Sequence, residues 1–79
     1  MDQLTELIDY VARALVDEPE DVQVEAVEGD RAVIIELTVA QSDLGKVIGR
    51  DGRTARAMRT LLSATSARMR RRAILDILE

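Results

Sequence analysis

The sequence has no cysteine and no histidine, and it contains a single aromatic residue, Tyr10, and a single proline, Pro19. Without cysteine there is no disulfide framework, and without histidine as well the usual ligands of transition metals are missing. General acid–base catalysis usually recruits histidine or paired carboxylates, and no convincing carboxylate pair occurs here. We therefore expect no metal centre, no cofactor and no enzyme activity, and a core held by packing alone.

Long apolar runs and a leader segment are also missing. The longest aliphatic runs, such as residues 32–35, fall far short of the roughly 20 residues that a membrane-spanning helix needs. The first residues are acidic and lack the basic stretch and apolar run of a secretory signal. We expect a soluble, cytoplasmic protein without membrane contact. A chain of 79 residues accommodates one small domain, residues 1–79.

Charge is plentiful but unevenly distributed along the chain. The net charge is −4, yet residues 1–43 contain 12 carboxylates and two arginines, whereas residues 44–79 contain nine basic residues and three carboxylates. Such asymmetry can steer a polyanion toward one end of a protein whose overall charge is negative. Ordinary solvation of the surface explains the same charges equally well on composition alone.

The first half of the chain reads as a helix followed by a β-hairpin. Apolar residues recur every three or four positions and predict an amphipathic helix over residues 3–16. Pro19 disfavours helical geometry in the residue before it, so residues 17–20 form a connector. Alternating apolar residues over 22–26 and 33–39 flank the turn residues Glu28, Gly29 and Asp30 and predict the hairpin.

The second half reads as two helices and a strand. Ser42 or Asp43 can cap a short helix over residues 43–48, which Gly49 ends. A longer helix follows from Gly52 to about Met69, with apolar positions in one sector and Arg53, Arg56 and Arg59 outside it; these apolar positions are Ala55, Met58, Leu62, Thr65 and Met69.

Residues 73–78 are short and β-branched enough for a last strand, although a helical continuation also satisfies the periodicity. The order is then α-β-β-α-α-β. It predicts an α+β fold with a three-stranded mixed sheet, helices on one face, and parallel second and third strands.

Gly49 and Gly52 bracket Arg50 and Asp51 between the two predicted helices. Glycine permits the backbone angles and close approach that a phosphate-binding turn requires. The following helix begins with free N–H groups and the positive end of its dipole, and both favour an anion. A GxxG pair alone is a weak signal, and these glycines do not fit a Walker loop. Its position between two helices, with basic residues around it, predicts a phosphate clamp.

The segment from Leu44 to Ala55, LGKVIGRDGRTA, resembles the signature of KH domains, in particular the small bacterial KhpA group. The resemblance covers essentially the whole chain and implies a type II-like KH domain. Its GxxG loop would clamp about four nucleotides of single-stranded RNA. Ile48, Ala55 and parts of the second strand would border the base groove. The expected RNA-binding residues are Lys46, Ile48, Gly49, Arg50, Asp51, Gly52, Arg53 and Arg56.

Several features modify this expectation. The turn Glu28–Asp30 matches the family's variable loop across the groove, but it is short and acidic and should grip RNA poorly. Asp51 is more simply explained as a cap of the following helix than as an RNA contact. The lone Tyr10 lies far along the chain from the clamp, so base stacking on aromatic rings is missing and sequence specificity should be low.

Some functional alternatives stay open at this point. The cluster Arg68 and Arg70–Arg72 either extends the RNA path or is solvated charge at a helix end. Single-stranded DNA is an alternative ligand, because a phosphate clamp does not read the 2′-hydroxyl. The resemblance implies an RNA chaperone or post-transcriptional regulator linked to cell elongation and division.

A protein-interaction module is the alternative function. If the last strand turns its odd-numbered residues inward, Ile74 and Leu78 lie on the opposite face of the sheet with Ile34, and no helix remains to cover that face. A contiguous apolar patch there would indicate a partner. The resemblance implies a homodimer or a heterodimer with a larger KH protein of the KhpB/Jag type.

Overall fold

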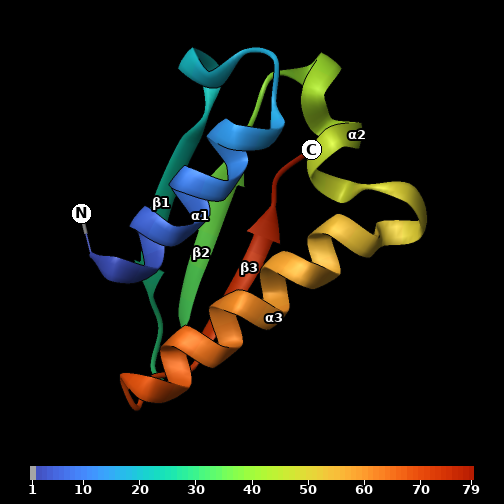
Figure 1. The fold of residues 1–79 in the computed structure, drawn as a ribbon. Coiled ribbons are helices and arrows are strands. Elements are labelled where there is room, and N and C mark those ends of the chain that lie inside the picture. The colour runs from blue at the N-terminus through green and yellow to red at the C-terminus, as the bar shows by residue number, and fades with distance from the viewer. Residues whose placement is uncertain (1) are drawn as a thin grey trace.

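The computed structural model describes residues 2–79, and its elements follow the predicted order (Figure 1). The helices are α1 (Gln3–Leu15), α2 (Leu44–Ile48) and α3 (Arg53–Arg68), and the strands are β1 (Gln23–Glu28), β2 (Val33–Thr38) and β3 (Ala73–Ile77). The strands are ordered β1-β2-β3, antiparallel between β1 and β2 and parallel between β2 and β3. The predicted α+β fold with a mixed sheet is confirmed, including the last strand.

Local chemistry explains where α1 begins and ends. The Asp2 carboxylate accepts a hydrogen bond from the Thr5 backbone N–H at 2.9 Å, which satisfies one of the free donors at the start of the helix. After Leu15 the chain leaves helical geometry, and Pro19 begins a single 3₁₀ turn. The Arg13 guanidinium donates to the Pro19 carbonyl oxygen at 2.8 Å and ties this connector to the helix.

The core lies between the helices and one face of the sheet, as Figure 1 shows. Alternate residues of β2 are buried, and every helix contributes; the fully buried large side chains include Leu4, Ile8, Val33, Ile35, Leu37, Val47, Met58 and Leu62. On α3 the buried position after Leu62 is Ser66, whereas the predicted Thr65 is only half-buried. The helical period explains this, because Ser66 follows Leu62 by four residues.

The other face of the sheet has no helix over it among residues 2–79 (Figure 1). The strand register places Val27, Ile34 and Ile74 side by side in one row, and this trio is called the apolar row below. The next row consists of three carboxylates, those of Glu25, Glu36 and Asp76. Val27 is 43% exposed and Ile74 is 44% exposed. The prediction that Ile74 lies on this face is confirmed.

Across residues 2–79, every helix is too short or too polar to cross a membrane.

Candidate nucleic-acid interface

The GxxG loop depends on Gly49 for both its backbone angles and its space. The Gly49 N–H donates to the Gly45 carbonyl oxygen at 2.8 Å and closes α2. Its φ of 77° and ψ of 171° lie in a region that is essentially restricted to glycine. A Cβ atom at this position would lie 2.8 Å from the Thr54 backbone nitrogen and would also collide with the Thr54 side chain. The loop therefore packs directly onto the first turn of α3.

Two left-handed residues then turn the chain into α3. Asp51 has φ 57° and Gly52 has φ 74°, and the Gly52 N–H donates to the Gly49 carbonyl oxygen at 3.1 Å. The prediction that Asp51 caps α3 is wrong, because Gly52 occupies the cap position and no side chain caps the helix. Asp51 has left-handed backbone angles and lies one residue before the cap position. The Arg53 N–H donates to the Arg50 carbonyl oxygen, and no side chain caps the N–H groups that follow it at the start of α3, where an external anion is favoured.

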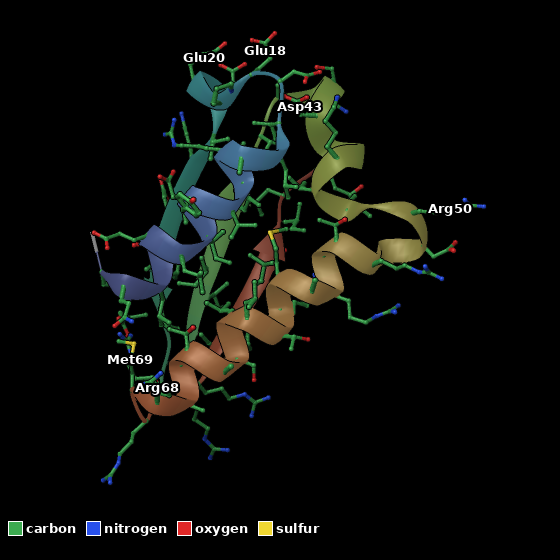
Figure 2. The ribbon with its side chains drawn as sticks, viewed as in Figure 1. Glu18, Glu20, Asp43, Arg50, Arg68 and Met69 are labelled. Atoms are coloured by element: carbon green, nitrogen blue, oxygen red, sulfur yellow. The ribbon has the colours of Figure 1, made fainter. Side chains whose placement is uncertain are left out.

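Exposed arginines surround this uncapped helix start. Arg50 lies in the loop, and Figure 2 shows its side chain projecting away from the body of the molecule. Arg53, Arg56 and Arg59 follow on the exposed surface of α3. The Arg56 guanidinium donates to the Asp51 carbonyl oxygen at 3.5 Å, which holds it beside the loop. The positive charge predicted from the sequence is thus gathered around the free N–H groups.

A groove of about 470 Å³ opens beside the loop; its lining consists of Ile48, Gly52, Ala55, Arg56, Arg59, Ile77 and Glu79. It brings together three of the predicted site residues. The prediction that the second strand borders the groove is wrong, because β2 is the central strand and the edge strand β3 lies next to α3. Sequence reasoning missed Ile77 and Glu79 for this reason, whereas it had placed Arg59 among the basic residues of the helix. The Glu79 carboxylate opposes an anionic ligand there.

The sequence model of a protein family, the KhpA/KhpB KH domain, matches residues 5–77 of this chain. The chain belongs to the KhpA/KhpB family of KH domains. It is 50% identical over 74 residues to an RNA-binding protein KhpA of Borreliella burgdorferi, covering 94% of this chain and 90% of that protein. It is also 44% identical to an RNA-binding protein KhpA of Aquifex aeolicus over the full length of both chains. The resemblance inferred from the GxxG segment is confirmed.

In this KhpA/KhpB-family domain, Asp43 links the connector after α1 to the start of α2. Its side chain is 1% exposed and accepts hydrogen bonds from the backbone N–H groups of Asp17 at 3.2 Å and Glu18 at 3.0 Å. Burial raises the pKa of the Asp43 carboxyl, but these bonds and the bond from Lys46 outweigh burial and lower it overall. Figure 2 shows Asp43 at the start of α2, near Glu18.

Asp43 occupies the predicted cap position of the short helix, but the prediction that its side chain caps the free N–H groups is wrong, because no side-chain cap bond forms there. A single 3₁₀ turn over Gln41–Asp43 precedes α2 instead. No local sequence signal identifies this role of Asp43, since its partners lie 25 and 26 residues earlier in the chain.

Lys46 is held by carboxylates at the other end of α2 from the loop. Its ammonium group lies 3.1 Å from the Asp17 carboxylate and 3.2 Å from the Asp43 carboxylate. The hydrogen bond to Asp17, followed by the one to Asp43, raises the pKa of Lys46. The side chain therefore stays charged, but its charge is already matched locally.

The turn at Glu28–Asp30 lies at the opposite end of the sheet from the groove. Glu28 is in register with Val33 and Ala73 at the start of β3, whereas the groove contains Ile77 at the end of that strand. The expectation that this turn faces the loop across the groove is therefore wrong. The Glu28 carboxylate instead accepts a hydrogen bond from the Arg71 guanidinium at 2.7 Å.

Proposed function

We propose that this KH domain binds single-stranded RNA by its backbone, through the GxxG loop, with little sequence specificity. The observation that carries the proposal is the uncapped start of a 16-residue helix, which exposed arginines surround beside an open groove. Free N–H groups, the helix dipole and guanidinium groups all favour phosphate oxygens. Relatives that match nearly the whole chain are named RNA-binding proteins.

The predicted residues take different parts in this proposal. Arg50, Arg53 and Arg56 neutralise phosphates, and Gly49, Asp51 and Gly52 shape the loop that receives them. Ile48 lines the groove and contacts bases. Lys46 contributes to the field around the loop rather than a direct contact, because two carboxylates hold its ammonium group.

Low sequence specificity follows from the kinds of side chain that line the groove. Its side chains are aliphatic or charged, and Tyr10, which is 76% exposed on α1, is not among them. Without an aromatic platform, bases are held by aliphatic contact and polar edges. A backbone grip of this kind suits an RNA chaperone or a post-transcriptional regulator in the cytoplasm, and we place the protein in that class, with a link to cell elongation and division.

Replacing Arg50 with aspartate is expected to weaken binding of labelled single-stranded RNA by about tenfold or more, because it reverses the charge at the clamp. For the unmodified protein, four neutralised phosphates predict a slope of about −3 when the logarithm of the binding constant is plotted against the logarithm of the salt concentration. Titrations at several salt concentrations measure both quantities. Arg50 is exposed and the substitution keeps both glycines, so the fold should persist.

Arg31→Asp is the matched control for this experiment. Arg31 is also exposed, and the substitution makes the same change of net charge on the β1–β2 turn, at the far end of the sheet from the groove. Equal binding by the Arg50→Asp variant and the unmodified protein would contradict the proposed clamp. So would an affinity that does not depend on salt.

We also propose that the open face of the sheet receives a second KH chain, either a copy of this one or a larger chain of the KhpB/Jag type. The apolar row is contiguous across all three strands, which distinguishes it from scattered surface aliphatics. The neighbouring row of carboxylates repels a polyanion, so this face suits a protein rather than RNA. The family description covers both KhpA and KhpB.

Ile74→Glu is expected to abolish self-association, because it places a charge at the β3 end of the apolar row, which the second chain would bury. Light scattering at increasing protein concentration should show a mass approaching that of two chains for the unmodified protein and of one chain for the variant. Tyr10→Glu is the control, since Tyr10 is an exposed large side chain on the helical side of the molecule. A monomer at all concentrations before mutation would contradict self-association.

A further inference from the structure

A second hollow of about 360 Å³ lies on the same seam between α3 and β3 as the GxxG groove. Its lining comes from the end of α3, with Ser63, Ser66 and Ala67, from the segment before β3, with Arg71 and Arg72, and from the start of β3, with Ala73 and Ile74 of the apolar row. The GxxG groove contains the start of α3 and the end of β3. The two hollows therefore lie at opposite ends of one helix and one edge strand.

Helical spacing places both hollows on the same side of α3. Arg56, Arg59, Ser63 and Ala67 follow one another at intervals of three or four residues, so their side chains form one stripe along the helix. β3 is an edge strand, and its outer edge is unpaired within residues 2–79. Among residues 2–79 no strand lies beyond this edge, and the stripe on α3 between the hollows continues with the small side chains of Ser63 and Ala67.

The far end of this seam carries positive charge. Arg72 is exposed, and residues 2–79 include no ion pair or side-chain hydrogen bond to it. Arg71 is only partly free, because its guanidinium contacts Glu28 at 2.7 Å and Asp2 at 3.9 Å. Figure 2 shows Arg50 and Arg68 at opposite ends of α3, so this charge is separate from the charge at the loop.

We propose that a bound RNA strand continues from the GxxG groove along the α3–β3 seam and places a phosphate against Arg72 in the second hollow. This inference rests on the proposed RNA binding and extends its footprint. Arg56 and Ala67 are separated by 11 helical residues, or about 16 Å along the axis. At a stacked spacing of about 3.4 Å, this length accommodates about five nucleotides beyond the four of the clamp.

The test compares 5′-phosphorylated uridine oligonucleotides of four and ten nucleotides, so that the shorter strand already carries four phosphates, with the unmodified protein and with Arg72→Glu. For the unmodified protein, the salt dependence should be steeper for the longer strand by about 0.7 for each added phosphate contact. The Arg72→Glu variant should lose this difference and bind the ten-nucleotide strand about fivefold or more weakly, while four-nucleotide binding changes little. Additional binding registers on the longer RNA affect both proteins equally.

Arg31→Glu is the matched control, because it makes the same charge change near Arg72 but on the β1–β2 turn and off the seam. If Arg31→Glu reduces ten-nucleotide binding as much as Arg72→Glu does, the loss comes from the general electrostatic field of the protein, and the proposed path along the seam is overturned. An equal salt dependence for both lengths also overturns it. Loss of four-nucleotide binding in Arg50→Asp tests the clamp separately, and light scattering of each variant shows whether its oligomeric state has changed.

Discussion

Replacing Gly49 with alanine is expected to lower the free energy of unfolding by about 3 kcal/mol, out of a total of roughly 4–12 kcal/mol for a chain of this size. The backbone angles of Gly49 are strained for any residue with a Cβ atom. In addition, the new Cβ atom would lie 2.8 Å from the backbone nitrogen of Thr54, which belongs to α3 and cannot rotate away. Either α3 shifts or the loop changes shape.

Gly52→Ala is the matched control, because both glycines have positive φ but only one is crowded. A Cβ atom at Gly52 meets nothing within 4 Å, and φ 74° with ψ 14° is a left-handed conformation that other residues occupy at a cost of about 1–2 kcal/mol. Asp51, with φ 57°, already occupies this region in the same loop. Gly49→Ala should therefore lose more stability than Gly52→Ala.

Urea unfolding followed by circular dichroism measures both losses, and RNA titration below the unfolding transition measures the effect on the clamp. The Gly49→Ala variant should lose RNA binding even where it remains folded, because the loop can no longer pack onto the first turn of α3. Equal losses of stability for the two variants would show that backbone angles alone matter and that the Thr54 contact is unimportant.

Most of the fold could be predicted because its signals are local. Apolar spacing placed α1 and α3 within one or two residues of their observed bounds, and Gly49 ended α2 as expected. The strand alternation identified which residues of β2 and β3 face the core, including Leu75. Periodicity and turn chemistry act over a few residues, so a single sequence contains the information that these elements need.

Apart from those at the helix caps, the errors concern positions that depend on which distant segments meet. Topology alone decides that β3, rather than β2, borders the groove, and that the turn after Glu28 lies at the other end of the sheet. The arginines of α3 were found because charge and helical spacing are visible in sequence. The ion pair between Lys46 and Asp17 was not, because Asp17 lies 29 residues away and no local pattern connects the two.

Asp43→Asn is expected to lower the melting temperature at neutral pH by about 10 °C, because one buried carboxylate accepts hydrogen bonds from two backbone N–H groups and an ammonium group. An asparagine side chain has one oxygen and one NH₂ group, so it leaves a donor facing a donor. Asp30→Asn removes the same charge on the exposed β1–β2 turn and should change the melting temperature by no more than a few degrees.

The effect of Asp43 should also depend on pH in a specific direction. Its folded-state pKa is below the usual aspartate value of 3.8, so the carboxylate contributes stability that is fully present above that value and is lost as the pH falls through the folded pKa. The stability gap between the unmodified protein and Asp43→Asn should therefore be constant near neutral pH and should narrow below about pH 3.8. Asp2, whose pKa is also lowered, titrates in both proteins and cancels in the difference.

Asp43 should affect RNA binding only through the position of α2. It lies one five-residue helix away from the GxxG loop, and it fastens the start of that helix to the connector at Asp17 and Glu18. RNA affinity of Asp43→Asn, measured well below its melting temperature, should fall while the salt dependence stays the same, because no phosphate contact is removed. A steeper salt dependence would instead mean that the freed Lys46 contacts phosphates, and would contradict a purely positional role.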